Sequence, residues 1–283
     1  MYRKLARCIS ALILSALLLQ GSALAAVNLD EVICLPVVMY HAVRPGDSGK
    51  DAITPQEFES DLKFYRDSGY TAVTMRDLAR HMSGEQALPE KPIILSFDDG
   101  YYNNYKYVYP LLREYDTRIV MSVITKAMDD FTETPSTNAG YAHMTWGQLR
   151  EMVDSGHAEV QNHSHNLHKL GKSRIGCGQK KGESFADYSK VLSEDIEKSQ
   201  LRIYEMTGIA ASTFAYPYGK YNDNTVTILK ELGLAASLSC DHGVNLISKS
   251  GETDLFNLKR ICRAHNQSAE KVIKDAMRTL DYR

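Results

Sequence analysis

The chain has 283 residues, of which 43% are hydrophobic, so it has material for one large domain or two small ones around a substantial core. Its formal net charge of −2 predicts no general attraction to nucleic acid or to anionic membranes. A basic partner site would have to be local.

Residues 1–25 have the composition of an export signal. Basic residues lie between positions 3 and 7, an apolar run covers residues 9–19, and a small-residue cleavage site follows at residues 23–25. An uncleaved membrane anchor is the alternative, although the run is short for a spanning helix. We therefore expect a secreted or cell-envelope protein without stable membrane insertion after cleavage, with a short segment at 26–33 and one domain at 34–283.

Four cysteines follow the signal, at Cys34, Cys177, Cys240 and Cys262. An even number in an exported protein allows one or two disulfide bonds, with three ways of pairing all four. None stands in a C-x-x-C spacing, so a metal-thiolate or redox motif is disfavoured. Four unpaired cysteines are the alternative, for an organism that lives without oxygen.

Short apolar runs alternate with helical patterns through the domain. The runs resemble buried strands and cover residues 35–39, 93–97, 119–124, 158–161, 213–215, 235–238 and 258–262. Strands that alternate with helices predict an α/β fold with mostly parallel strands.

The helical patterns carry start and stop signals. Thr54-Pro55-Gln56-Glu57 supplies an N-cap, a proline at the first helical position and a glutamate reaching back, and Gly69 ends the pattern. Thr145 to Gln148 repeats the device, with Gly156 as the stop. A further helix is expected to run to about Gly208.

Two segments of the second half differ from this pattern. The polar residues 169–184 predict a long surface loop directly after a histidine cluster, where it can border a substrate groove. Residues 268–280 predict a closing helix.

The stretch IILSFDDGYYNNY ends an apolar run in two adjacent carboxylates, Asp98 and Asp99, followed by Gly100. In parallel α/β folds, sites are built at the carboxyl ends of strands. A simple turn, with Asp-Gly chosen for its backbone geometry, is the alternative. Two like charges beside a buried strand oppose each other unless a cation or a shared proton relieves them, which favours a functional site.

The stretch QNHSHNLH places three histidines within six positions, at His163, His165 and His168. A solvated loop is the plain alternative. One carboxylate and two histidines are a typical ligand set for zinc or a related ion. On a strand His163 and His165 would share a face, and on a helix His165 and His168 would. His163 and His168 can form a site together only if the chain turns from strand into helix between them. The residues after Val160 suggest that turn.

Two further segments are candidates for the site. FAYPYGKYN offers a proline-fixed turn at Tyr218, where backbone N–H groups could face a ligand, although an ordinary aromatic turn is the alternative. VVMYHAV places His41 at the end of the first strand of the domain, where a lone histidine is usually structural.

Together these residues resemble the polysaccharide deacetylases of carbohydrate esterase family 4. Ser96 to Gly100 matches the family's T/S-F-D-D-G, with Asp98 at the position of the catalytic base and Asp99 at that of a metal ligand. His163-Ser164-x-x-x-His168 matches the family's second motif, which implies His163 and His168 as the other ligands and leaves His165 as a neighbour.

The resemblance covers residues 35 to about 268. MTWGQLREMVDSGH and FAYPYGKYN are similar to the branch of secreted poly-N-acetylglucosamine deacetylases. The resemblance implies a distorted (β/α)7-type barrel that is circularly permuted. It also implies a divalent metal (zinc, or else cobalt or nickel) and an N-acetylated polysaccharide as substrate.

Two positions depart from the family pattern. Ala215 stands where many members have the third-motif arginine that braces the base, and Arg260 or Arg263 is the expected substitute. The usual Leu-x-x-His that supplies the general acid is absent near the carboxyl end, and in the poly-N-acetylglucosamine branch a first-strand histidine replaces it. This implies His41 as the acid, with His265 as its rival.

The implied activity is metal-assisted hydrolysis of N-acetyl groups on exopolysaccharide or peptidoglycan. Asp98 would take a proton from water, His41 would protonate the departing amine, and a backbone N–H near Tyr218 would stabilise the oxyanion. Tyr101, Trp146 and Tyr218 are candidates for stacking on sugars, Tyr218 first. The alternatives are a non-catalytic glycan-binding protein on the same scaffold, an esterase of the O-acetyl xylan type, and a purely structural metal site.

Overall fold

A computed structural model describes residues 32–46, 49, 51–250 and 253–280, and residues 33–283 form one compact unit. The predicted export signal and cleavage site lie outside the described residues. The elements, in chain order, are β1 (Val32–Leu35), β2 (Val37–Tyr40), β3 (Ala42–Val43), β4 (Ala52–Ile53), α2 (Pro55–Asp67), β5 (Thr71–Ala72), α3 (Met75–Met82), β6 (Pro92–Asp99), the π-helix η2 (Asn104–Val108), α4 (Tyr109–Glu114), β7 (Ile119–Val123), α5 (Thr125–Glu133), α6 (Trp146–Asp154), β8 (Ala158–Asn162), α7 (Phe185–Thr207), β9 (Thr213–Ala215), the 3-10 turn η3 (Pro217–Gly219), α8 (Asp223–Glu231), β10 (Ala236–His242), β11 (Asn245–Ser248), β12 (Leu258–Cys262) and α9 (Ala269–Met277).

Seven parallel strands close into a barrel in the order β2, β12, β10, β9, β8, β7 and β6, and β6 pairs back with β2. The short strand β5 adds alongside β6. Between β8 and β9 the register has a single pair, Asn162 with Phe214, which makes the barrel irregular there. The predicted strands and the (β/α)7-type barrel are confirmed, whereas the circular permutation stays a prediction.

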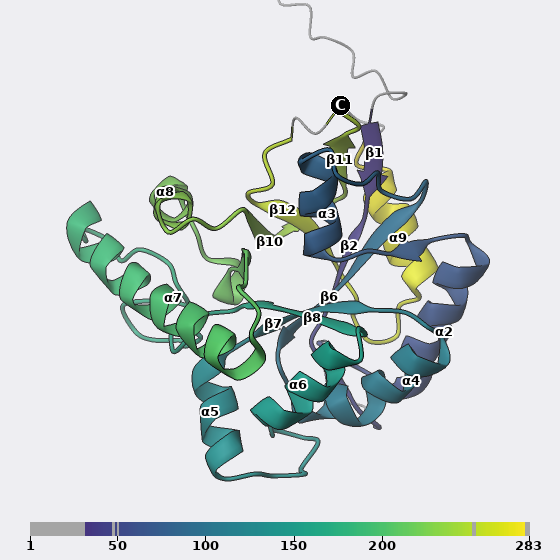
Figure 1. The fold of residues 1–283 in the computed structure, drawn as a ribbon, viewed down its shortest axis with the longest axis horizontal. Helices are drawn as coiled ribbons and strands as arrows, with labels where there is room; N and C mark the ends of the chain where they lie inside the picture. Colours follow the sequence, from purple (N-terminus) through teal and green to yellow (C-terminus); the bar gives the residue numbers. More distant parts are fainter. Residues whose placement is uncertain (1–31, 47–48, 50, 251–252, 281–283) are drawn as a thin grey trace, which may run out of the picture. The chain divides into compact units, whose positions relative to one another are not determined.

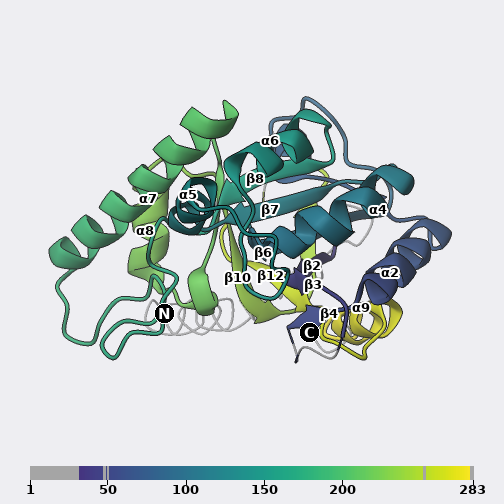
Figure 2. The ribbon, with the colours of Figure 1, turned by 90° about the horizontal axis from the view of Figure 1, so that it is seen from below.

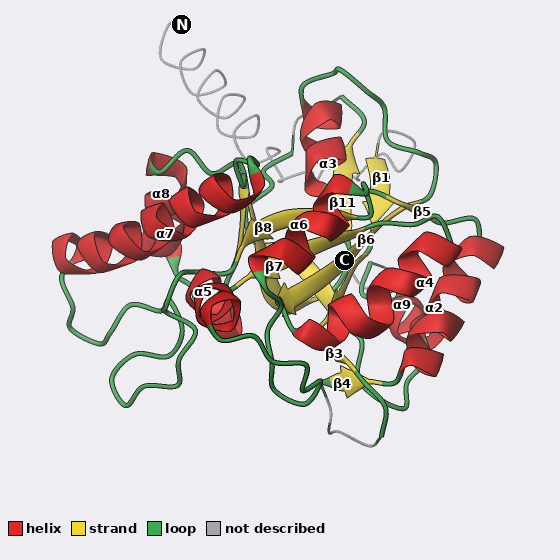
Figure 3. Cartoon of the chain, turned by 60° about the horizontal axis from the view of Figure 1, so that its bottom comes forward, coloured by secondary structure: helices red, strands yellow, loops and turns green. Residues whose placement is uncertain are grey.

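Helices lie around the outside of the strands (Figures 1 and 3). Figure 2 shows α2 beside α9 on one side of the barrel and α7 beside α8 on the other, and these pairs are in contact. None of the helices in the described part of the chain has the length and apolar character needed to cross a bilayer.

The predicted helix signals act as expected. Thr54 accepts from the backbone of Glu57, whose carboxylate accepts from the backbone of Thr54, and Thr145 and Gln148 do the same at α6. Gly208, in the left-handed conformation (φ 73°), ends α7. Residues 169–184 contain neither helix nor strand, as predicted.

Alternate residues of each strand pack on opposite faces of the barrel wall. Ile94 and Val120 belong to one buried cluster, together with Leu258 and other strand residues, whereas Leu95 and Met121 belong to another. Because side chains alternate along a strand, Ser96 and Asp98 lie on the same face as Ile94. This face turns polar toward the carboxyl end of β6.

Three of the four cysteines outside the signal, Cys34, Cys177 and Cys240, are free thiols, so none of the three complete pairings is formed. Each has another neighbour: Cys34 contacts the sulfur of Met277, the thiol of Cys177 donates to the carbonyl of Lys220, and the sulfur of Cys240 lies 3.7 Å from Nη2 of Arg260. Cys34 lies on β1, Cys177 in the loop before α7 and Cys240 on β10.

Candidate active site

Asp98 and Asp99 end β6 at the carboxyl edge of the barrel, and they are 1% and 3% exposed. Asp99 and Gly100 both have positive φ angles, 73° and 76°. A Cβ at Gly100 would lie 3.1 Å from Cγ1 of Val123, so glycine is required there. The Asp-Gly turn is therefore present, and it gives the two carboxylates different surroundings.

Asp99, His163 and His168 come together as one group. Asp99 Oδ1 lies 3.5 Å from His163 Nε2 and 3.3 Å from His168 Nε2, and one ligand atom from each residue lies within 4.8 Å of the others. His163 Nδ1 hydrogen-bonds the carbonyl of Ala215 at 2.8 Å. Since a carbonyl can only accept, Nδ1 carries a proton, and Nε2 is the ring nitrogen that faces Asp99.

These three residues fit a divalent cation. Asp99 Oδ1 is buried and has no hydrogen-bond partner among the described residues, although a buried carboxylate oxygen without a donor is costly. Burial, together with nearby His163, lowers the pKa of His168 to about 4, so its imidazole is neutral at pH 7. A carboxylate beside two imidazoles is a ligand set for zinc or a related ion with positions left open.

His165 lies apart from this group. Its Nδ1 contacts the hydroxyl of Thr125 at 2.9 Å, and its backbone N–H donates to Asp195. Residue 164 has a φ of 76°, which turns the chain after His163. The chain at residues 163–168 is therefore neither a strand, which would put His163 and His165 on one face, nor a helix, which would put His165 and His168 on one face.

Asp98 forms a buried ion pair with Arg260, whose NH1 lies 2.9 Å from Asp98 Oδ1. Arg260 is on the same face of β12 as Leu258, which packs inside the barrel, so the alternation of the two strands brings them together. Burial alone would raise the pKa of Asp98, but Arg260, His163 and His41 hold that pKa well below its ordinary range. Asp98 is therefore ionised.

Arg263, the other candidate for the missing arginine, contacts Asp61 instead, with its Nε 2.7 Å from Asp61 Oδ2. The two candidate acids are also separated. His41 Nε2 lies 4.0 Å from Asp98 Oδ2, whereas His265 Nδ1 lies 2.7 Å from a carboxylate oxygen of Glu57.

A cleft of about 760 Å³ contains these groups. Its lining brings together all six residues that the sequence predicted, with others from four loops: His41, Ala42, Arg44, Gly49, Asp51, Ala52, Asp98, Asp99, Tyr101, Asn103, Gly140, Tyr141, His143, His163, His168, Tyr216, Tyr218 and Cys240. Tyr218 is 39% exposed, and its ring centroid lies 4.3 Å from that of His168. Its φ of 57° belongs to the left-handed region, so the turn predicted from FAYPYGKYN is strained.

Trp146 is a correction to the predicted sugar-stacking rings. It is 1% exposed, and its indole N–H donates to Asp129 at 2.8 Å, so it belongs to the packing between helices. Trp146 begins α6, and it belongs to the same buried apolar cluster as Leu149 and Met152 of that helix.

His143 lines the cleft and was not predicted. Its Nδ1 lies 2.9 Å from the backbone carbonyl of Asp99, and its ring lies beside Tyr101. The only signal was proximity, because His143 directly precedes the phrase MTWGQLREMVDSGH.

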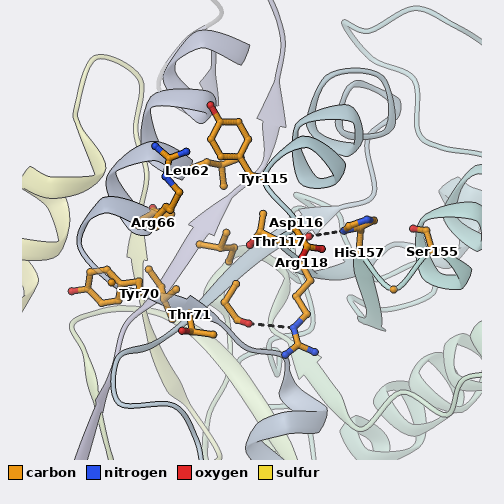
Figure 4. A pocket seen from close by; sticks show the side chains of 16 residues that line it. Leu62, Arg66, Tyr70, Thr71, Tyr115, Asp116, Thr117, Arg118, Ser155 and His157 are labelled. Atoms are coloured by element: carbon orange, nitrogen blue, oxygen red, sulfur yellow. Dashed lines mark hydrogen bonds between the residues drawn. The ribbon is translucent and has the colours of Figure 1, made fainter.

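A second cavity, of about 620 Å³, lies at the amino ends of the strands, away from these residues (Figure 4). Two of its polar side chains are engaged with neighbours: Arg118 contacts Asp77 and the carbonyl of Ala72, and His157 contacts the carbonyl of Thr117. None of the residues predicted for the site lines it.

Comparison with known proteins places this geometry in a family. The sequence model described as "Polysaccharide deacetylase" matches residues 85–237, more than half of the chain. The protein YxkH of Bacillus subtilis (strain 168) is 26% identical over 228 residues, 80% of this chain and 70% of that protein. The poly-beta-1,6-N-acetyl-D-glucosamine N-deacetylase of Staphylococcus epidermidis is 26% identical over 254 residues, 83% of this chain and 81% of that one.

Among solved structures, the Streptococcus pyogenes deacetylase PplD in complex with acetate is 25% identical and superposes with a TM-score of 0.69. The alignment covers 87% of this chain and 99% of PplD. The chain therefore belongs to the polysaccharide deacetylase family.

Proposed function

We propose that the protein is a metal-dependent hydrolase that removes N-acetyl groups from N-acetylglucosamine-containing polysaccharide, either exopolysaccharide or peptidoglycan. One observation carries the proposal: a buried, ionised carboxylate, Asp98, lies in the same cleft as the Asp99, His163 and His168 group. The Staphylococcus epidermidis relative, by its name, acts on such a polymer.

Asp99, His163 and His168 would hold the metal, with zinc as the first choice and cobalt or nickel as the others. When bound, the ion supplies Lewis-acid activation of water and of the acetyl carbonyl. A backbone N–H near Tyr218 is the proposed donor to the oxyanion, a contribution worth about 3 to 4 kcal/mol per donor.

Asp98 is the proposed base because one of its oxygens is already engaged and the other is not. Arg260 binds Oδ1, while Oδ2 faces His41 at 4.0 Å. Oδ2 is thus the atom that would accept the proton of the attacking water.

His41 is the proposed acid, because the departing amine must be protonated for the tetrahedral intermediate to go forward. It lines the cleft with its side chain 28% exposed, so it can reach both substrate and Asp98. From the composition of residues 1–25 we further propose that the enzyme works outside the cell or at its envelope.

Acetate release from a panel of glycans tests the proposal. The panel contains β-1,6-linked and chitin-type N-acetylglucosamine oligomers, peptidoglycan and O-acetylated xylan, each assayed with zinc, cobalt and nickel forms of the protein. We expect release from the N-acetylated glucosamine polymers, loss of that release with a chelator, and loss in Asp98→Asn with metal content unchanged.

Other outcomes would replace the proposal. Glycan binding without acetate release indicates a binding protein, and release from xylan alone indicates an O-acetyl esterase. Full activity in Asp98→Asn would refute the assigned base.

A further inference from the structure

We propose that Asn104, assisted by Asn103, is a positioning residue that holds His41 beside Asp98. The inference rests on the proposed function, in which His41 is the acid. These asparagines belong to the YYNNY stretch that follows the two aspartates, and neither is used in the chemistry above.

His41 occupies a break in the backbone pairing. It follows β2 of the barrel and precedes β3, which pairs with β4 outside the barrel. A residue at such a junction has no strand ladder of its own to fix it, so side chains must hold its peptide groups.

Two adjacent asparagine side chains grip the chain on either side of this junction. Asn104 Nδ2 donates to the carbonyl of His41 at 2.9 Å, and Asn103 Oδ1 accepts from the N–H of Val43 at 3.0 Å. The Nδ2 of Asn103 then donates to the carbonyl of Ala139, next to cleft residues Gly140 and Tyr141. Asn103 therefore connects β3, which follows His41, to the loop of the cleft that contains Ala139.

Both asparagines are fully buried, at 1% and 0% exposed, and Asn104 opens the π-helix η2. Single π-turns are rare and are frequent at functional sites. Asn104 Oδ1 is buried and has no hydrogen-bond partner in the described part of the chain. Packing alone does not explain a side chain that buries an unpaired oxygen. The amide is present because its Nδ2 donates a hydrogen bond.

The first experiment reads the position of His41 without using activity. The imidazole NMR signals of His41, in zinc-loaded protein that carries isotopically labelled histidine, are assigned by their loss in His41→Gln. We expect Asn104→Leu to shift or broaden these signals and to leave those of His81, on α3, unchanged. Unchanged His41 signals would overturn the proposal whether or not the protein is an enzyme.

The second experiment reads kcat and KM on the best N-acetylated oligomer. We expect Asn104→Leu to lower kcat by roughly tenfold to a hundredfold, as a misplaced catalytic group does, with KM within about twofold and metal content unchanged. Hydrolysis of an activated aryl acetate, whose leaving group needs no proton, should be largely retained.

Asn245→Leu is the matched control, because Asn245 is also buried and donates to the carbonyls of Leu35 and Lys259, at the amino end of β2. It should lose stability without changing the ratio of amide to aryl-ester activity. If Asn104→Leu behaves like Asn245→Leu, the proposal is wrong. Should Asn104→Leu not fold, Asn104→Asp serves in both experiments, because it keeps the size and removes the donor.

If wild-type protein releases no acetate from any glycan, the proposed function fails by itself, and the ring signals still decide the role of Asn104.

Discussion

At the scale of single residues, the site is a set of buried charges that compensate one another. Arg260 neutralises Asp98, whereas Asp99 Oδ1 lies beside the Nε2 atoms of His163 and His168 and has no hydrogen-bond partner among the described residues. Asp98 therefore has its counter-ion within the protein, and the surroundings of Asp99 suit a cation. This difference is the basis of the different roles proposed for the two neighbouring aspartates.

Arg260→Met should destabilise the fold by about 3 to 5 kcal/mol, because it leaves the buried carboxylate of Asp98 without its partner. The double variant Asp98→Asn/Arg260→Met should regain most of that free energy of unfolding but no acetate release. Urea unfolding of the single and double variants measures the coupling. Simply additive losses would mean that the two side chains do not act as a pair.

His163→Gln should lower zinc affinity by more than about a hundredfold, since even the loss of an outer partner of a ligand costs up to that much. His165→Gln is the matched control, because His165 is also buried, two residues after His163, but contacts the hydroxyl of Thr125. Metal per chain after dialysis, measured by mass spectrometry, separates the two. Loss of zinc in His165→Gln and retention in His163→Gln would reverse the assignment of ligands.

At the scale of elements, three helices share one carboxylate. Asp129 on α5 accepts from the indole of Trp146 at the start of α6, and Arg202 on α7 lies 2.7 Å from it. Burial alone would raise the pKa of Asp129, but hydrogen bonds from Arg202 and Trp146 lower it below its ordinary value. Asp129 therefore links the helices that cover β7 and β8.

Asp129→Ala should cost about 1 to 2 kcal/mol, from one lost hydrogen bond and one half-exposed ion pair. Because the folded pKa is depressed, this stability is present above the unfolded pKa of about 3.9 and is lost as pH falls through the folded value. Urea unfolding followed by circular dichroism at pH 7 and at pH 3 measures both effects.

Asp130→Ala is the control for this prediction, because Asp130 is exposed and its carboxylate pairs with Lys126 one turn away on the same helix. It should cost less than about 0.5 kcal/mol at either pH. Equal losses in Asp129→Ala and Asp130→Ala would show that Asp129 does not join the helices.

At the scale of the whole molecule, the core and the site are separate. The buried apolar clusters extend over the strands of the barrel and the helices around them, whereas Asp98, Asp99, His163 and His168 line a cleft at its carboxyl edge. The barrel is thus closed by apolar burial and strand pairing, and the site is set into its carboxyl edge.

Removing the metal should therefore silence the enzyme without unfolding it. Zinc at about a thousand times its dissociation constant stabilises a protein by about 4 kcal/mol, so chelation should lower the melting temperature while the far-ultraviolet spectrum at 25 °C stays the same. Calorimetry and circular dichroism, with zinc added back, check this. Unfolding at 25 °C on chelation would show instead that the metal is structural.

The amino-acid sequence by itself determined the strands, the capped helices and the short motifs, because these depend on neighbours a few residues apart. It also identified the family through Ser96 to Gly100 and the histidine pair. What it left open were choices between residues far apart: Arg260 or Arg263, and His41 or His265. Closure of the barrel brings Arg260 to Asp98 across 162 positions of sequence and places His41, rather than His265, beside Asp98. The role of His41 as the acid stays a proposal.

The same reason explains the errors. Trp146 looked available for sugars until α6 packed on α5. Disulfide bonds and free thiols were both open from the sequence, and the fold leaves Cys34, Cys177 and Cys240 as thiols. Neither the place of His143 before the phrase MTWGQLREMVDSGH nor that of Asn104 after the two aspartates showed what these side chains do. Each forms a hydrogen bond to a backbone carbonyl that only the tertiary structure brings near.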